Sequence, residues 1–328
     1  MSTLYAIALH VRTLLITSLL LSGITSQAAP QLVEVPDFGA NPGNLRMFVH
    51  SPATFSESIL RAPLVIALHG CSQSAERLVV SSGWNKLADE RGFHVIYPQQ
   101  RTFNNATGCF NWFRRDDITD GGEAASILQM IQHAIATLPI DSDRVFIYGV
   151  SAGGAMAVNL MACHPSLFNA GAVIAGGPFL GNAGPMEAMR SMIEPADETP
   201  EERAATVRAM HPGYTGVYPR LLVIHGQEDR VAHPRNSIEL IEQWADLHGI
   251  DPMVRDVGTG LPSIPGLERW IYRDGNGLEL LVLYQFSGLG HAIPIDPGEG
   301  PCQGGQVRRY AIDLDLHSTC TIADFFRL

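Results

Sequence analysis

The sequence predicts an α/β fold, with one mostly parallel central sheet, helices on both faces and a cap-like insertion. Short apolar runs alternate with longer amphipathic stretches along the 328 residues, as such a fold requires. The composition, with 46% hydrophobic and 17% charged residues, is typical of a globular protein. A run of small residues around Ser151 directly follows an apolar run, a pattern typical of a tight strand-to-helix turn. No linker-like segment interrupts residues 29–328, which are therefore expected to form one domain.

The N-terminal segment has the layout of a secretory signal peptide. Arg12 precedes an apolar run over residues 13–24, and small residues follow up to Ala29. We expect residues 1–28 to be removed, with cleavage after Ala28 or Ala29. An uncleaved anchor is the alternative, but an apolar run of about 12 residues is shorter than the roughly 20 that a spanning helix needs. The mature protein is therefore expected to be secreted, in the periplasm or the medium, without stable membrane association.

The charge balance argues against a nucleic-acid partner. The formal net charge is −11, and the chain has no run of clustered Lys and Arg. Such a protein repels a phosphate backbone.

Four strands and two helices stand out along the chain. The strand candidates are rich in aliphatic, β-branched or aromatic residues and end near turn residues: 64–68, 95–97, 145–148 and 221–224. Between the second and third, residues 124–138 place apolar side chains at helical spacing, so this helix should pack on the sheet. A second helix is predicted from Asn236 until Gly249, a residue typical of helix ends.

Residues 178–218 break this alternation, because they are rich in Gly, Pro, Met and acidic residues. Thr199, Pro200 and Glu202 predict the capped start of a helix within this segment. We interpret the segment as a cap over the functional site, with a plain surface insertion as the alternative.

A β-hairpin is predicted closer to the C-terminus. Residues 270–272 and 278–286 are apolar, and between them lies the turn sequence Asp274-Gly275-Asn276-Gly277. Asp-Gly and Asn-Gly pairs are typical of hairpin turns.

Ser151 is the predicted nucleophile. It lies at the centre of Gly149-Val150-Ser151-Ala152-Gly153, after the strand 145–148 and before a helix-like run. A strand-to-helix elbow exposes a serine hydroxyl beside a base, and the small neighbours leave room for the turn. The motif in this context predicts an α/β-hydrolase.

The acid and the base should follow Ser151 in that order along the chain. Asp229 lies just past the strand 221–224 and is the predicted acid, with Glu228 as its competitor. His291 follows the strand 278–286 in a glycine-containing loop and is the predicted base. His317, the other late histidine, lies among polar residues that are typical of a solvated segment.

Two backbone amides are predicted to stabilise the oxyanion. One is the N–H of Ala152, directly after the nucleophile, and the other is the N–H of Cys71 in the loop after the strand 64–68. Neither a metal nor a cofactor is expected for this chemistry.

The chain has five cysteines, all after the predicted signal peptide, and export permits disulfides. Cys163 is expected to be unpaired, because it lies on the helix after the nucleophile, where a buried thiol acts as a small apolar group. Four cysteines allow three connectivities. From their placement in the fold we predict Cys71–Cys109 and Cys302–Cys320. The first bridge would stiffen the oxyanion loop.

Together these segments resemble the polyhydroxybutyrate depolymerase family of esterases, over nearly all of the mature chain. The resemblance rests on six segments: residues 68–71, 82–85, 109–113, 149–154, 290–291 and 320–326. It implies ester hydrolysis through an acyl-enzyme, with Ser151, Asp229 and His291 as the triad and the Cys71 loop as the oxyanion site. The family is also similar to feruloyl and acetylxylan esterases.

The resemblance leaves the ester substrate open. A hydroxyalkanoate polyester or its oligomers is the leading prediction, and a feruloyl or acetylated carbohydrate is the alternative. Two other classes of function remain as alternative hypotheses, a non-catalytic binding protein and a peptidase. Trp112 and Trp270 are the predicted substrate contacts, although each side chain could equally belong to the core.

Overall fold

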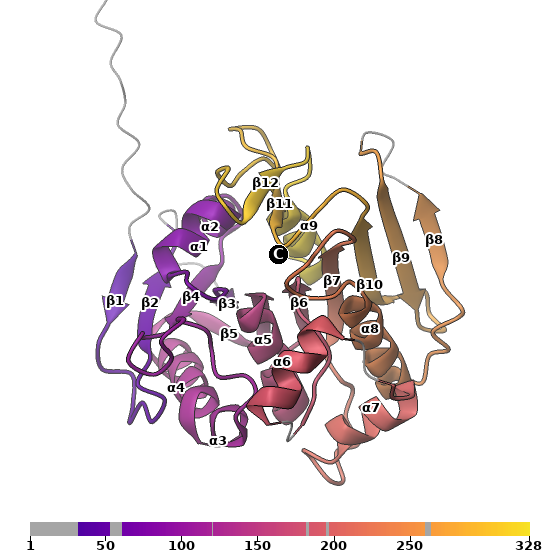
Figure 1. Ribbon diagram of the computed structural model, residues 1–328. Coiled ribbons are helices and arrows are strands. Elements are labelled where there is room, and N and C mark those ends of the chain that lie inside the picture. The colour runs from indigo at the N-terminus through magenta and orange to yellow at the C-terminus, as the bar shows by residue number, and fades with distance from the viewer. Residues whose placement is uncertain (1–31, 53–60, 120, 182–183, 195–196, 260–263) are drawn as a thin grey trace, which may run out of the picture.

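The computed structural model describes residues 32–328 apart from 53–60, 120, 182–183, 195–196 and 260–263 (Figure 1). The predicted signal peptide, residues 1–28, lies outside the described residues. Within the described part of the chain, no helix is both long and apolar enough to cross a membrane.

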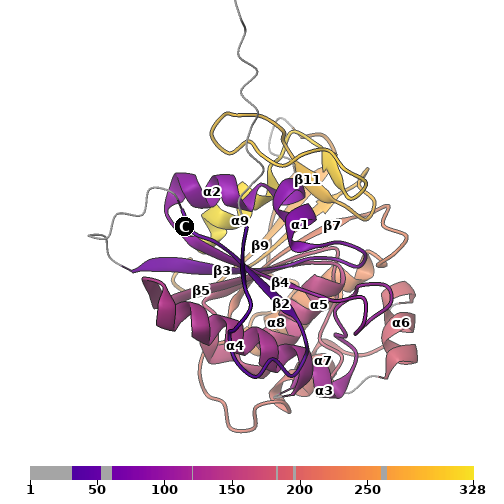
Figure 2. The same cartoon turned by 90° about the vertical axis from the view of Figure 1, so that its left-hand side faces the viewer.

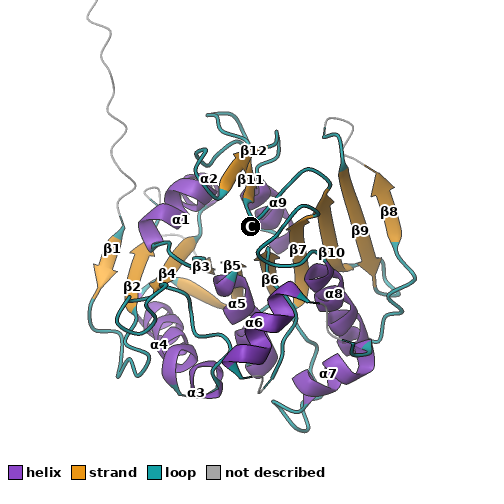
Figure 3. Cartoon of the chain, in the orientation of Figure 1, coloured by secondary structure: helices purple, strands orange, loops and turns teal. Residues whose placement is uncertain are grey.

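The described residues form one large open sheet of ten strands, in the order β1-β2-β4-β3-β5-β6-β7-β10-β9-β8. In Figure 3 its orange strands run from β1 at one side of the molecule to β8 at the other. The strands are β1 (Val33–Val35), β2 (Arg46–His50), β3 (Ala62–Leu68), β4 (His94–Gln99), β5 (Ile140–Val150), β6 (Ala170–Ile174), β7 (Arg220–Gly226), β8 (Asp256–Thr259), β9 (Leu267–Arg273) and β10 (Glu279–Phe286).

The central strands β4, β3, β5, β6, β7 and β10 are parallel to their neighbours in this group. Both edges are antiparallel, because β1 and β2 extend the sheet beyond β4, and β9 and β8 extend it beyond β10. A separate parallel pair is formed by β11 (Ile293–Ile295) and β12 (Ala311–Asp313).

Helices cover both faces of the sheet, as Figure 2 shows with the sheet seen on edge. The α-helices are α1 (Ala75–Ser82), α2 (Trp84–Arg91), α3 (Arg115–Ile118), α4 (Gly122–Thr137), α5 (Ala152–Cys163), α6 (Pro185–Ile193), α7 (Pro200–Arg208), α8 (Arg235–His248) and α9 (Ser318–Phe326). A short 3₁₀ turn spans Pro165–Leu167. One layer contains α1, α2 and α9, and the opposite layer contains α4, α5 and α8.

The two layers explain why β3 is apolar throughout. All seven residues of β3 are buried. Leu64, Ile66 and Leu68 pack in the core beside α4 and α5, whereas Val65 and Ala67 pack in the core beside α1 and α2. Alternate side chains of a strand point to opposite faces, so a strand covered on both sides must be apolar at every position.

The predicted helices and the hairpin are confirmed. The helix predicted at 124–138 is α4, and α8 ends at Gly249 in the left-handed conformation. Strands β9 and β10 pair antiparallel on either side of the predicted turn. Thr199 and Glu202 form the capping box at the start of α7.

The segment 178–218, for which the sequence predicts a cap, contains α6 and α7. Helix α7 packs on α8, and Gln243 of α8 donates hydrogen bonds to the backbone oxygens of Phe179 and Arg203. The α7 part of the segment is therefore integrated into the layer beside α8. Helix α6 buries only Ala188 and presents Met186 and Met189 to solvent.

Candidate active site

The candidate site lies where the direction of chain progression across the sheet reverses. From β3 the chain passes to β4 on one side and then returns to β5 on the other side of β3. The loops that leave the carboxyl ends of β3 and β5 therefore diverge, and ligands of open α/β sheets bind at such a point. His69, Gly70 and Cys71 follow β3 at this point, and Ser151 follows β5.

Ser151 lies in a strained elbow between β5 and α5. Its φ of 55° and ψ of −122° are unusual for a residue with a side chain. A Cβ atom at Gly149 would collide with the backbone of Gly153, and one at Gly153 would collide with the carbonyl oxygens of Leu68 and His69. Only glycine at these two positions lets the turn close against the end of β3.

The structure brings Ser151, His291 and Asp229 into one chain of hydrogen bonds. His291 Nε2 lies 2.9 Å from Ser151 Oγ, and His291 Nδ1 lies 2.7 Å from Asp229 Oδ2. Ser151 and Asp229 are 7% and 5% exposed. An imidazole held between a carboxylate and a hydroxyl can accept the hydroxyl proton while the carboxylate stabilises the resulting positive charge.

Neighbouring parallel strands bring the acid and the base together. Asp229 follows β7 and His291 follows β10, and these strands pair along their length. The two loops are also joined, because Glu228 N donates to Leu289 O at 3.0 Å. A Cβ atom at Gly226 would collide with Leu289 O, so this close approach requires glycine.

The structure distinguishes Asp229 from its competitor. Asp229 is buried and contacts His291, whereas Glu228 is exposed. The Oδ1 atom of Asp229 accepts the backbone N–H groups of Val231 and Ala232, so both carboxylate oxygens are engaged.

A second histidine contacts the same carboxylate. His225 Nε2 lies 3.0 Å from Ala232 O and 3.3 Å from Asp229 Oδ2, inside the protein. Burial raises the pKa of Asp229, but hydrogen bonds from His225 and His291 outweigh it and hold the pKa well below the ordinary value. Asp229 is therefore ionised at neutral pH. This contact of His225 was not predicted from the sequence.

His317 does not lie at this site. Asp313 and Asp315 in its segment are exposed, as expected, but His317 itself is not. Its side chain is buried, with Nε2 2.7 Å from Ser82 O at the end of α1. Short polar residues around it suggested exposure, but its imidazole packs between α1 and the C-terminal segment. His317 holds these elements together.

The loop after β3 lies directly against the nucleophile. A Cβ atom at Gly70 would stand 3.4 Å from Ser151 Cβ, which is ordinary van der Waals contact. Cys71 directly follows Gly70 in this loop, and Ala152 N–H is the first amide of α5. The N-terminal amides of a helix favour negative charge, as a developing oxyanion requires.

The structure contains both predicted disulfides. Cys71 is joined to Cys109, and Cys302 is joined to Cys320, with Cα atoms 4.1 Å and 5.2 Å apart. Cys163, predicted to lie outside the disulfides, takes part in neither bridge.

The two tryptophans lie in different surroundings. Trp112 is partly buried against the core beside α5, and its carbonyl oxygen accepts from Asn159 Nδ2 at 2.7 Å. Trp270 lies within β9, opposite Leu283 of β10, and Arg255 stacks on its ring at 3.9 Å from the centroid. The structure therefore places Trp270 within the sheet, separated from the loop of Asp229 by the intervening strand β10.

Three carboxylates lie close together elsewhere in the described structure. Oxygen atoms of Asp296, Asp313 and Asp315 lie within 4.8 Å of one another. The side chains of Asp313 and Asp315 are exposed, and exposed acidic groups commonly gather without a metal.

Comparison with known proteins agrees with this geometry. The family described as Esterase PHB depolymerase matches residues 50–258. The poly(3-hydroxyalkanoate) depolymerase C of Paucimonas lemoignei is 38% identical over 318 residues, which cover 96% of this chain and 74% of that protein. Feruloyl esterase B of Thermothelomyces thermophilus is 33% identical over 275 residues, or 82% of this chain and 90% of that protein.

A solved structure shows the same fold. The acetyl xylan esterase from Aspergillus awamori superposes with a TM-score of 0.71 at 28% sequence identity, and the alignment covers 80% of this chain and 94% of that one. The fold is therefore that of an α/β-hydrolase with an open sheet. The chain belongs to the Esterase PHB depolymerase family and is a carboxylic ester hydrolase.

Proposed function

We propose that the protein is a secreted serine esterase that hydrolyses hydroxyalkanoate esters through Ser151, His291 and Asp229. The observation that carries the proposal is the pair of hydrogen bonds from His291, at 2.9 Å to Ser151 Oγ and 2.7 Å to Asp229 Oδ2. These distances allow direct proton transfer between the serine and the imidazole.

The reaction would proceed in two halves. Ser151 Oγ attacks the ester carbonyl carbon while its proton passes to His291 Nε2, and the carbonyl oxygen becomes an oxyanion facing the N–H groups of Ala152 and Cys71. Collapse breaks the ester C–O bond, and the leaving alkoxide takes the proton from His291. Water then attacks the acyl-enzyme by the same steps and releases the acid.

The substrate class is inferred from the relatives and from one exposed aromatic side chain. The relative from Paucimonas lemoignei is a poly(3-hydroxyalkanoate) depolymerase. Phe103, on the loop that the Cys71–Cys109 bridge ties to the oxyanion loop, is 92% exposed. An exposed aromatic ring suits contact with an apolar polyester chain.

A feruloyl or acetylated carbohydrate is the second candidate. It is favoured by the feruloyl esterase at 33% identity and by the acetyl xylan esterase with its TM-score of 0.71. The catalytic groups would act in the same way, so the two candidates differ only in the acyl group and the alcohol that are bound.

We also propose that α6 borders the substrate entrance. Met192 O accepts the N–H of His233 at 2.7 Å, so the end of α6 is joined to the loop that begins at Asp229. Export through the predicted signal peptide is consistent with the two disulfides.

A substrate panel tests the proposal. Purified enzyme is assayed on amorphous polyhydroxybutyrate, methyl ferulate, acetylated xylan and an amide analogue, alongside Ser151→Ala. We expect ester cleavage that includes the polymer, no amide cleavage, and a loss in kcat of about 10⁴-fold or more in the variant. Activity confined to ferulate and acetylxylan would overturn the polyester assignment. Full activity of Ser151→Ala would overturn the serine mechanism.

A further inference from the structure

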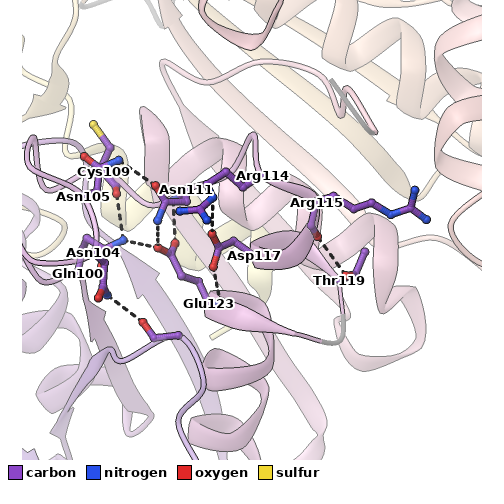
Figure 4. A network of polar contacts seen from close by, with 11 residues as sticks. Gln100, Asn104, Asn105, Cys109, Asn111, Arg114, Arg115, Asp117, Thr119 and Glu123 are labelled. Atoms are coloured by element: carbon purple, nitrogen blue, oxygen red, sulfur yellow. Dashed lines mark hydrogen bonds and ion pairs between the residues drawn. The ribbon is translucent and has the colours of Figure 1, made fainter. Parts of the chain in front are cut away.

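Glu123 is a buried carboxylate that the proposed reaction does not use. It lies in the first turn of α4 and is 1% exposed. Its Oε2 accepts from Asn111 N at 2.7 Å, and its Oε1 accepts from Asn111 Nδ2 at 2.6 Å and from Gln100 Nε2 (Figure 4). All three partners are N–H donors, and an ionised carboxylate offers acceptors only, so the donors and acceptors match.

The same network organises the segment between Gln100 and Asn111. Gln100 Nε2 donates to Cys109 O at 3.0 Å, and Asn105 Nδ2 donates to Asn111 Oδ1 at 2.9 Å. Burial raises the pKa of Glu123 to about 7, while the hydrogen bonds from Asn111 and Gln100 oppose this rise. A buried carboxylate is costly unless its partners stay in place, so the segment is held in one arrangement.

The segment reaches the oxyanion loop first through His69. Gln100 N donates to His69 Nε2 at 3.1 Å, so the imidazole proton lies on Nδ1 and is donated to Gly70 O at 2.8 Å. Burial lowers the pKa of His69 to about 4, which keeps the ring neutral, and its two hydrogen bonds determine the tautomer.

The position of Gly70 O determines where the Cys71 amide points. Gly70 O and Cys71 N–H belong to one peptide group, and in a trans peptide the two bonds point in opposite directions. When His69 holds the oxygen on one side, the N–H is directed to the other. The orientation of this oxyanion donor therefore depends on His69, together with Gln73 N, which donates to the same oxygen at 3.3 Å.

The segment reaches the same loop a second time through Cys109, which is bonded to Cys71. Next to this bridge, Ser72 N donates to Thr107 O at 2.9 Å. Ser72 has a φ of 58°, an unfavourable value for a residue with a side chain. The contacts with Cys109 and Thr107 hold this strained backbone directly after Cys71.

We propose that Glu123 is a positioning residue for the oxyanion donor. It holds the segment from Gln100 to Asn111, and this segment fixes the Gly70–Cys71 peptide through His69 and Cys109. The inference rests on the proposed role of Cys71 N–H in ester hydrolysis. Glu123 itself touches neither the substrate nor the reacting atoms.

The test compares Glu123→Gln with the wild type at pH 8, above the pKa of Glu123. The variant keeps the size of the side chain but turns one acceptor oxygen into an NH₂ that faces N–H donors. Steady-state kinetics on p-nitrophenyl butyrate give kcat and KM. Inhibition by an alkyl trifluoromethyl ketone reports on the donors directly, because Ser151 adds to its carbonyl and leaves an oxyanion in the same place.

We expect kcat to fall about tenfold or more with little change in KM, and the ketone inhibition constant to rise by a similar factor. Gln100→Met, which removes the donors to Glu123 and Cys109 while keeping the backbone N–H on His69, should change the same constants in the same direction. This second variant decides the question if Glu123→Gln does not fold. Glu201→Gln, an exposed glutamate in the first turn of α7, is the matched control and should behave as the wild type.

Folded variants with unchanged kcat and unchanged ketone affinity would overturn the inference, as would an effect confined to KM. A failure of the proposed function gives a different result. In that case the wild type itself would not cleave the ester, and a phosphonate would not label Ser151.

Discussion

His291 Nδ1 lies 2.7 Å from Asp229 Oδ2, across 62 residues of sequence. The bond joins the loops that leave two neighbouring parallel strands, β7 and β10, at the same edge of the sheet. Asp229 is buried and also accepts two backbone N–H groups, so its carboxylate is fixed before any substrate arrives. The imidazole is thereby held facing Ser151.

Asp229 should make stability depend on pH in the acid range. Burial raises its pKa, but the bonds from His225 and His291 bring it well below the ordinary 3.8. The unfolded chain therefore takes up this proton at higher pH than the folded protein, and the contribution of Asp229 to stability is present above about pH 4 and lost as pH falls further. The difference in unfolding free energy between wild type and Asp229→Asn, measured in urea, should shrink from about pH 6 to about pH 3. Parallel pH profiles for the two proteins would contradict this.

Gly153→Ala should destabilise the elbow. The added methyl group would collide with the carbonyl oxygens of Leu68 and His69, which are fixed at the end of β3. We expect the free energy of unfolding to fall by about 1–3 kcal/mol, with loss of esterase activity because Ser151 moves. Gly184→Ala is the control, because a Cβ atom there meets nothing within 4 Å. Equal stability of the two variants would show that the elbow has room to relax.

The two disulfides should differ in their effect on catalysis. Replacing either pair with serines should cost about 2–4 kcal/mol of stability, since each bridge restricts the unfolded chain. Only the pair Cys71→Ser and Cys109→Ser should lower kcat, because this bridge holds the loop whose residue-71 N–H is the proposed oxyanion donor. The pair Cys302→Ser and Cys320→Ser provides the comparison, measured with the same ester at a temperature where both variants are folded. A similar loss of kcat in both double variants would mean that a general loss of rigidity lowers kcat, and not the loss of the bridge at the Cys71 loop.

Trp270→Ala should lower stability rather than substrate affinity. The Arg255 guanidinium stacks on the Trp270 ring. In the sheet, Trp270 lies between its strand partners Val257 and Leu283. We expect a loss of about 2 kcal/mol from the missing ring contacts, and a change in KM below about twofold. Thermal unfolding and steady-state kinetics measure the two effects. A large rise in KM with unchanged stability would instead support the substrate contact predicted from sequence.

Local patterns were sufficient for the elements whose signal lies within a few residues. The helix α4, the capping box at Thr199 and the hairpin turn after Arg273 depend on periodicity or on neighbouring side chains, and all are confirmed. The antiparallel edge strands β1, β2 and β8 were not predicted. They are short, and their place depends on which strand they pair with.

The same distinction applies to the site. The residues Ser151, Asp229 and His291 follow from a motif, from their order along the chain and from the strands before them. That they meet at hydrogen-bond distance was decided by the tertiary structure, which makes β5, β6, β7 and β10 successive neighbours in the sheet.

The residues that hold the candidate site in place, Glu123 and His69, had no signal in the sequence. Nothing around Glu123 distinguishes it from a solvated glutamate at the start of a helix, and its role depends on Gln100 and Asn111, which lie 23 and 12 residues away. His69 likewise acquires its tautomer from Gln100, 31 residues along the chain. A side chain's bonding partners are set by packing between distant segments. The proposed role of Ser151 could therefore be predicted from its own neighbourhood in the sequence, whereas the groups that hold the Gly70–Cys71 loop can be identified only in the folded chain.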